Sequence, residues 1–299
     1  MSKLFFFGFL LVIGTVWGAT IPLTKLAVST GHGPLGLIFW QMLISALVLG
    51  AIALVRRTSL GVTRQHLIFY AVIALIGTII PNGFSYFSAF YLPGGVMALT
   101  IAAVPLFALP IALIFGLERP DLVRLVGVLL GMVAISLLVL PETGLPDPSL
   151  AIFVLIALIA PFCYGVEACY LSLAVPAGTG ALHTLLGASV IGTGLSLPLA
   201  VATGQFVDPL AGLGTAEYSL VASTIMHVVA YGGYIWLVEK AGSVFASQVA
   251  YIVTPAGVIL SMLALGETHS GWLWASLALM LLALAMVQPR KAGAETVAD

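Results

Sequence analysis

Residues 91–118 read YLPGGVMALTIAAVPLFALPIALIFGLE, and a degenerate copy of this stretch returns at residues 241–267 as AGSVFASQVAYIVTPAGVILSMLALGE. Each copy opens with a glycine turn, continues through an apolar helix that a central proline interrupts, and closes on glycine and glutamate. The copies lie about 150 residues apart in a chain of 299 residues. We therefore expect two halves, each ending with this unit and one further apolar helix.

The helix breakers of the two copies are equally spaced. Pro105 precedes Gly116 by eleven residues, and Pro255 precedes Gly266 by eleven residues. Internal symmetry with breakers at matching depths is typical of membrane transporters, in which one structural unit is used twice.

Composition excludes a soluble domain. Hydrophobic residues make up 61% of the chain and charged residues 7%, with a mean hydropathy of +1.19, whereas soluble domains carry about 25% charged residues. About 20 apolar residues cross a bilayer as a helix, and runs such as 122–140 are apolar on every face, unlike barrel strands. The first segment has no clean cleavage site, so we expect it to stay in the protein as a span. The ten expected spans are 4–28, 34–55, 66–89, 94–116, 121–140, 150–173, 179–203, 217–238, 243–265 and 271–288.

The basic residues indicate the orientation. With a cytoplasmic N-terminus, nine of the ten Lys and Arg residues fall on the cytoplasmic side, and the tenth, Lys25, lies inside or at the rim of the first helix. The opposite loops carry acidic residues only, which is a positive-inside pattern for ten spans with both termini in the cytoplasm. The nine residues are Lys3, Arg56, Arg57, Arg64, Arg119, Arg124, Lys240, Arg290 and Lys291.

These patterns predict an all-α integral membrane fold of ten transmembrane helices, arranged as two inverted five-helix repeats around a central cavity. The first repeat is expected over residues 1–145, the second over 146–290, and a cytoplasmic tail over 291–299. Helices 5 and 10 carry few polar side chains. They are expected at the periphery, facing lipid or the second subunit of a homodimer.

Aromatic residues mark the middle of the first and sixth helices. At an offset of 147 residues Trp17 aligns with Tyr164, and Gly18 aligns with Gly165. An aromatic ring beside a backbone gap can form a platform for a flat ligand, but glycine is also frequent where membrane helices simply pack closely. Both interpretations remain open.

The third and eighth helices carry further polar groups. His227, Tyr231 and Tyr234 follow the i, i+4, i+7 spacing and share one helix face. Because lipid does not solvate an imidazole and two phenols, this stripe is expected to face the protein interior. Tyr86 aligns with Tyr234 at an offset of 148, and Asn82 lies one turn before Tyr86. Alternatively, the phenols only bridge neighbouring helices by hydrogen bonds.

Two ionisable residues lie within predicted spans. Lys25 is expected to extend to the outer rim. Glu167 lies nearer the cytoplasmic side of its helix, where an unpaired carboxylate is costly and indicates a substrate or proton site. A structural role, with hydrogen bonds to a neighbouring helix or to cytoplasmic water, is the alternative.

The full set of expected cavity-lining residues draws on six helices. They are Trp17, Asn82, Tyr86, Thr100, Tyr164, Glu167, His227, Tyr231, Tyr234, Gln248 and Tyr251. Prolines within helices remove a backbone hydrogen bond and produce kinks. The expected hinges or kinks are Pro22, Pro81, Pro105, Pro110 and Pro255.

The chain resembles the EamA type of the drug/metabolite transporter superfamily over essentially its whole length. The resemblance is carried by WGATIPLTK at residues 17–25, YLPGG and IAAVP in helices 3 and 4, and VTPAGVILSMLALGE in helix 9. Within that superfamily it is similar to YddG-type exporters of aromatic amino acids. The resemblance implies inverted five-helix repeats and export of amino acids or related metabolites across the bacterial inner membrane. Two departures are Gln41, where many members carry a basic residue, and Gly116–Glu118, which reads GLE instead of LGE.

Residue chemistry limits the substrate independently of this resemblance. Phosphorylated substrates call for intramembrane Lys or Arg, and the predicted lining instead suits a neutral or zwitterionic molecule with an apolar or aromatic part. A lipophilic-cation exporter of the same fold is the alternative, with a channel or a membrane enzyme as remote ones. No HExxH motif and no paired aspartates are present, so we expect no catalytic residues, metal or cofactor. The expected partners are a small-molecule substrate and membrane lipid, not nucleic acid.

Overall fold

The computed structural model describes residues 3–139, 145, 147–241 and 243–287, and all regular elements within this part of the chain are helical. The elements are α1 (Lys3–Val28), α2 (Pro34–Val55), α3 (Arg64–Ala74), η1 (Leu75–Ile79), α4 (Ile80–Tyr91), α5 (Gly94–Ile101), α6 (Val104–Ile114), α7 (Leu122–Val139), η2 (Pro148–Leu150), α8 (Ala151–Ala157), α9 (Ile159–Ala174), α10 (Ala181–Ala202), η3 (Pro209–Ala211), α11 (Thr215–Ala241), α12 (Ser243–Ala246), η4 (Ser247–Val249), α13 (Ala250–Leu265) and α14 (Gly271–Val287).

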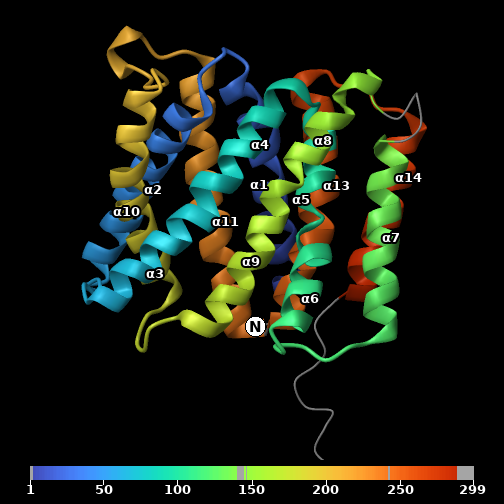
Figure 1. Ribbon diagram of the computed structural model, residues 1–299, viewed down its shortest axis with the longest axis horizontal. Helices are drawn as coiled ribbons and strands as arrows, with labels where there is room; N and C mark the ends of the chain where they lie inside the picture. The colour runs from blue at the N-terminus through green and yellow to red at the C-terminus, as the bar shows by residue number, and fades with distance from the viewer. Residues whose placement is uncertain (1–2, 140–144, 146, 242, 288–299) are drawn as a thin grey trace, which may run out of the picture.

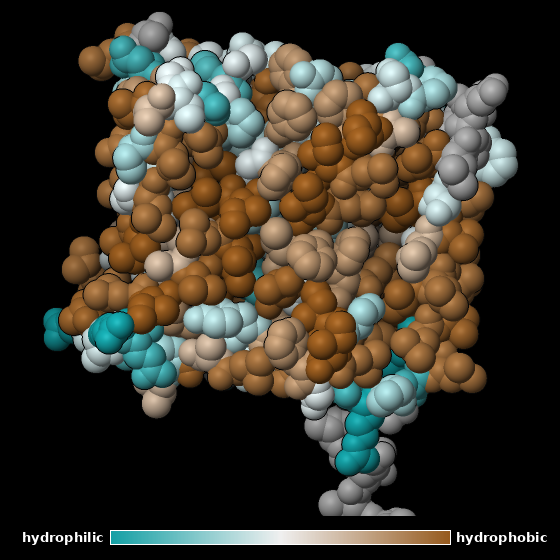
Figure 2. All heavy atoms as spheres, viewed as in Figure 1, coloured by the Kyte–Doolittle hydropathy of each residue, from teal (hydrophilic) through white to brown (hydrophobic). Residues whose placement is uncertain are grey.

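Within the described residues, nine helical segments are long and apolar enough to cross a membrane, and the shorter apolar helix Gly271–Val287 supplies a tenth candidate. Several spans consist of consecutive elements, such as α3, η1 and α4 over Arg64–Tyr91. Figure 2 shows apolar residues covering the middle of one face, with hydrophilic residues gathered toward its upper and lower edges. The prediction of an all-helical membrane protein is confirmed.

Two outer helix pairs flank a central group (Figure 1). The pair α2 and α10 lies on one side, and the pair α7 and α14 lies on the other. Between them, α1 packs against α11 and α13, while α9 packs against α4 and α6. When the two halves are exchanged, the contact of α1 with α11 corresponds to that of α9 with α4, and the contact of α1 with α13 corresponds to that of α9 with α6. Such equivalent contacts are expected for structural repeats.

The repeats are inverted relative to each other. In Figure 1 the chain begins at the lower edge and α1 runs upward, whereas α8 lies above α9 and the sixth span runs downward. The first span of one half therefore runs in the direction opposite to the first span of the other half. The last described helix, α14, ends near the same edge as the N-terminus.

Close backbone approach explains the matched glycines. A Cβ atom on Gly18 would lie 2.8 Å from the carbonyl oxygen of Val253 and 2.9 Å from the nitrogen of Gly257. On Gly165 it would lie 2.9 Å from the nitrogen of Ala108. The two glycines therefore serve helix packing at equivalent crossings, which supports the packing interpretation over a ligand gap beside each aromatic ring.

The two glycines that end the repeated units have the same backbone conformation, but the two central prolines occupy different positions in their helices. Gly116 has φ 66° and Gly266 has φ 67°, the left-handed conformation that glycine adopts readily at helix ends. Pro255 lies inside the continuous helix α13. Pro105 does not kink a continuous helix as expected, because the chain leaves the helix at Ala102–Ala103 and Pro105 lies in the first turn of α6.

The other expected breaker prolines fall in two settings. Pro22 lies inside α1 and Pro110 lies inside α6. Pro81 begins α4, directly after the π-helical turn η1. The ring of a proline crowds the carbonyl four residues earlier, here that of Gly77, and the wider π-helical turn accommodates this crowding.

The fifth and tenth spans, α7 and α14, lie at the edge of the bundle, as predicted (Figure 1). They pack closely on each other, and Ser276 Oγ donates a 2.6 Å hydrogen bond to the carbonyl oxygen of Ala134. The outward face of α7 exposes Leu122, Leu129 and Met132. Whether lipid or a second subunit covers this face stays a prediction.

Candidate functional site

Trp17 near the middle of α1 faces the polar stripe of α11. Its ring makes edge-on contacts with His227 at 5.5 Å and with Tyr231 and Tyr234 at 6.1 Å, measured between ring centroids. His227 stacks on Tyr231 at 6.4 Å. The predicted shared face of these three side chains is confirmed, and it points toward a neighbouring helix.

The stripe also faces away from the membrane. Val221, Ile225 and Val229 recur every four residues on α11 and are exposed, which marks the lipid-facing side of the helix. His227 is two residues from Ile225 and is therefore rotated from it by about 200°. Because His227 is exposed as well, its accessible surface faces the interior of the bundle.

A hydrogen-bond network joins the second, third and sixth spans. Gln41 Oε1 accepts from Asn82 Nδ2 at 2.8 Å and from the Tyr86 hydroxyl at 2.6 Å. Asn82 Oδ1 accepts from the Tyr164 hydroxyl at 2.9 Å. Asn82 and Tyr86 are buried, and Gln41 and Tyr164 are partly buried. Three predicted lining residues, Asn82, Tyr86 and Tyr164, thus belong to one network with Gln41, which the sequence did not place in the lining.

Glu167 lies one helical turn beyond Tyr164. A Cβ atom on Gly77 would collide with the Glu167 side chain, so the glycine of the π-helical turn leaves room for this carboxylate. Tyr164 and Tyr231 lie within electrostatic range of it. Glu167 has no hydrogen-bond or ion-pair partner within the described ranges. The carboxylate therefore retains its full capacity to accept hydrogen bonds.

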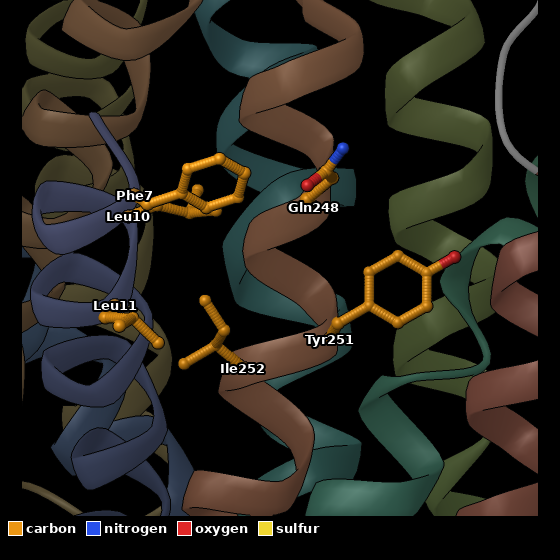
Figure 3. A pocket seen from close by; sticks show the side chains of 6 residues that line it. All are labelled: Phe7, Leu10, Leu11, Gln248, Tyr251 and Ile252. Atoms are coloured by element: carbon orange, nitrogen blue, oxygen red, sulfur yellow. The ribbon is translucent and has the colours of Figure 1, made fainter. Parts of the chain in front are cut away.

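Three expected lining residues lie elsewhere. Thr100 is fully buried and donates a 2.8 Å hydrogen bond to the carbonyl oxygen of Met97 in its own helix. Gln248 and Tyr251 border a groove of about 310 Å³ together with exposed Phe7 and Leu11. In Figure 3 the side chains of Gln248, on η4, and Tyr251, on α13, point away from α1.

The orientation of α13 accounts for the position of Gln248 and Tyr251. Its buried face carries Gly257, which approaches Gly18 and Ala98, and Ser261, which approaches Gly94. Tyr251 is six residues from Gly257 and is rotated from it by about 240°. The shared face of Gln248 and Tyr251 is therefore a different one from the face that approaches Gly18 and Ala98, and its place in the lining of a transport path stays a prediction.

A charged corner forms where the third span ends and the fourth begins. Lys25 Nζ donates to the carbonyl oxygens of Ala89 and Phe90 at the end of α4. Glu267 accepts from the backbone N–H groups of Gly94 at 2.6 Å and Gly95 at 3.1 Å at the start of α5. The cation thus meets the negative end of one helix and the anion the positive end of the next.

The environment of Glu267 keeps its carboxyl group ionised. Burial alone would raise its pKa, but hydrogen bonds from His269 and from the N–H groups of Gly94 and Gly95 outweigh that effect and lower the pKa below 4.5. His269 Nε2 lies 3.3 Å from Glu267 Oε2. The negative charge of Glu267 is therefore stabilised by the N–H groups at the start of α5. Lys25 lies within electrostatic range of the same carboxylate.

Sequence reasoning did not include Gln41 and Glu267 in the site. Gln41 was noted only for its departure from a family pattern, and a lone amide in an apolar helix gives no partner from spacing alone. Glu267 is the last residue of the repeated unit, and its recurrence there could have indicated a role for its side chain. Within the described ranges, no three His, Cys, Asp or Glu side chains are arranged to hold a metal ion.

Helical repeats with a polar and aromatic interior are typical of multi-pass membrane transporters, and residues 5–140 are similar to the EamA-like transporter family. Over 282 residues the chain is 26% identical to the uncharacterized inner membrane transporter YedA of Escherichia coli K12, covering 94% of this chain and 90% of YedA. The YedA sequences of strains O6:H1 and O157:H7 give the same values. The chain is thus homologous to an inner-membrane transporter.

One solved structure has the same fold. It is a crystal structure whose aligned residues are 19% identical, with a TM-score of 0.60, covering 92% of this chain and 96% of the other.

Proposed function

We propose that this protein exports amino acids, aromatic or otherwise neutral, and related small metabolites from the cytoplasm by alternating access. The observation that carries this proposal is the position of Trp17 against His227, Tyr231 and Tyr234, within reach of a Glu167 carboxylate that no described residue pairs. Aromatic walls bind an apolar side chain, and a carboxylate in a site of low polarity binds an ammonium group.

The direction of transport rests on the predicted orientation. Lys3, Arg56, Arg64 and Arg124 belong to the ends of helices that lie at the same lower edge as the N-terminus in Figure 1. The positive-inside pattern then favours a cytoplasmic location for this edge.

Alternating access is supported by an asymmetry between the two ends of the bundle. At the upper edge of Figure 1, α1 contacts α4 and α5, and α5 contacts α13. Exchanging the two halves gives the pairs that would make the same contacts at the other edge. These pairs are α9 with α11, α9 with α12, and α6 with α12. Within the described ranges these make no comparable contact. The helices thus converge at one edge, as in a carrier closed to the periplasm and open to the cytoplasm.

Polar contacts reinforce the converged edge. His32 Nε2, in the loop after the first span, lies 2.5 Å from Glu217 Oε1 of the eighth span. The hydroxyl groups of Thr24 and Ser223, which join the first and eighth spans, are 3.4 Å apart. Outward opening must break such contacts. In a channel without alternating states they would have no such role.

The cations of the structure argue against phosphorylated substrates. Lys25 is held by backbone carbonyls, and Arg124 is paired with Glu118 at 2.7 Å. Neither is free to neutralise a phosphate.

A lipophilic-cation exporter is the second candidate, because an unpaired carboxylate among aromatic rings also binds organic cations. Glu167→Gln separates the two proposals. For a cation exporter it abolishes cation flux and spares neutral compounds. For an amino acid exporter it weakens binding of the substrate ammonium group, while the aromatic and donor groups still contribute.

The test is flux into proteoliposomes that contain the purified protein, with a panel of labelled amino acids and lipophilic cations, with and without a pH gradient. Saturable amino acid uptake with counterflow is the expected result. Flux of cations alone would support the second candidate, and linear, non-saturating flux would contradict a carrier.

A further inference from the structure

We infer that Gln41 determines substrate specificity by donating hydrogen bonds from its amide nitrogen to the carboxylate of the transported molecule. This rests on the proposed function, which assigns the opposite, ammonium-binding role to Glu167. Gln41 lies on α2, and its partners lie on the third span.

The hydrogen-bond network fixes which way the Gln41 amide points. Tyr86 and Tyr164 each have a hydroxyl proton to donate, and the amide oxygens of Gln41 and Asn82 are the acceptors that receive them. Turning both amides around would present N–H groups to the phenol oxygens. Both hydroxyl protons would then lack an acceptor among the described residues, in a partly or fully buried setting where an unmade hydrogen bond is costly.

After these hydrogen bonds are made, the Gln41 amide offers only N–H donors to a further group. Gln41 Oε1 already accepts two hydrogen bonds, and Asn82 Oδ1 accepts one while Asn82 Nδ2 donates to Gln41. Gln41 Nε2 has no partner within the described ranges, and Gln41 is not fully buried. A group that approaches this amide therefore meets two N–H donors, which suit a carboxylate or carbonyl oxygen and not an ammonium group.

The donor group and the acceptor group belong to one continuous site. Tyr164 connects them, since its hydroxyl bonds to Asn82 and Glu167 follows it by three residues on the same helix. Residues three apart on a helix lie on the same side. The site thus offers N–H donors at one end and a carboxylate at the other, and Tyr231 of the Trp17 aromatic cluster lies within electrostatic range of that carboxylate. This arrangement is complementary to a zwitterionic amino acid.

The test compares probes that lack either the carboxylate or the ammonium group. The probes are the best-transported amino acid of the panel, its carboxamide, and 3-phenylpropanoate, which has a carboxylate but no ammonium group. The variants are Gln41→Glu, which keeps an acceptor for Asn82 and Tyr86 but replaces donors by negative charge, and Gln41→Met, which has neither. Gln205→Glu is the matched control, because Gln205 Oε1 accepts from the backbone of Leu35 in an outer contact.

We expect the wild-type protein to prefer the amino acid to its carboxamide, and both Gln41 variants to lower the amino acid's apparent affinity by about tenfold or more. Carboxamide flux in the same vesicles should change little, which shows that the variants are folded. The Gln205→Glu variant should keep the wild-type preference.

The outcomes separate this inference from the proposed function. Amino acid flux that falls in parallel with carboxamide flux, or does not fall at all, overturns the role of Gln41 and leaves the export function standing. Gln41-dependent flux of 3-phenylpropanoate without amino acid flux overturns the proposed function and retains the carboxylate site. If no carboxylate-bearing probe is carried or bound, both are wrong.

Discussion

The ammonium group of Lys25 lies 2.6 Å from the carbonyl oxygen of Ala89, and this hydrogen bond ties the end of the first span to the end of the third. A second bond of 2.9 Å reaches Phe90. The last carbonyls of a helix lack intrahelical donors and carry partial negative charge, so a cation satisfies both needs. Lys25 was expected to extend to the outer rim, and the structure adds that it binds a neighbouring helix there.

Lys25→Met should therefore shift the protein toward the conformation that is open at this edge. The variant keeps the length of the side chain but leaves the carbonyls of Ala89 and Phe90 without their donor. The measurement is the rate at which a membrane-impermeant maleimide labels a cysteine placed at Ser223, with Cys163 and Cys169 replaced by alanine. We expect labelling from the outside to accelerate several-fold.

Ser172→Ala is the matched control for this experiment. Ser172 occupies the position equivalent to Lys25 at the offset of 147, and its hydroxyl bonds only to Ala168 in the same helix. It should leave the labelling rate unchanged. Equal acceleration in both variants would show that Lys25 has no specific role at this edge.

Glu267→Gln should lower stability in a pH-dependent way. The pKa of Glu267 lies below its ordinary value of 4.5 in the folded protein, so ionisation stabilises the fold at pH above that ordinary value and this contribution is lost as the pH falls through the folded pKa. At neutral pH we expect a loss of about 1 kcal/mol, typical of an anion at a helix start. Thermal unfolding in detergent from pH 7 to pH 3 measures it.

The difference between wild-type and Glu267→Gln proteins should shrink toward the acid end of that range. Glu118→Gln provides a comparison from the equivalent unit of the first half, where the carboxylate pairs with Arg124. A stability difference at Glu267 that is independent of pH would contradict the role of its charge.

Gly18→Ala should destabilise the protein by about 1–3 kcal/mol, as overpacking in a close contact does. The new methyl group would lie 2.8 Å from the carbonyl oxygen of Val253, and a backbone atom has little room to move. Gly232→Ala is the control, because nothing lies within 4 Å of a Cβ atom there and alanine is the better helix former. Similar melting temperatures for the two variants would refute the close crossing.

The sequence predicted most of the fold because apolar length and repeat spacing are local signals. The second span was expected over 34–55 and is Pro34–Val55 in the structure. The i, i+4, i+7 spacing likewise placed His227, Tyr231 and Tyr234 on one face. Spacing gives relative positions around a helix, however, and not the direction in which a face points.

Because spacing does not give the direction of a face, three expected lining residues lie elsewhere in the structure. Gln248 and Tyr251 share a face, but close packing of Gly257 and Ser261 against Gly18, Ala98 and Gly94 uses a different face of the same span. Thr100 was expected in the lining because it is polar, yet its hydroxyl bonds to its own helix. The network around Gln41 depends on contacts between three helices, which no local pattern in the sequence specifies.

Trp17→Ala and His227→Ala should each reduce substrate flux by about tenfold or more, whereas Tyr251→Ala should retain it. The first two remove rings from the internal aromatic cluster, and the loss of one stacking or edge contact to a bound ring costs about 1 kcal/mol in addition to its buried area. Tyr251 borders the groove beside exposed Phe7 and Leu11. The measurement is initial flux in proteoliposomes, corrected for folded protein by gel filtration. If Tyr251→Ala loses flux as strongly as Trp17→Ala while remaining folded, the substrate path runs along α13 and the central site is wrongly placed.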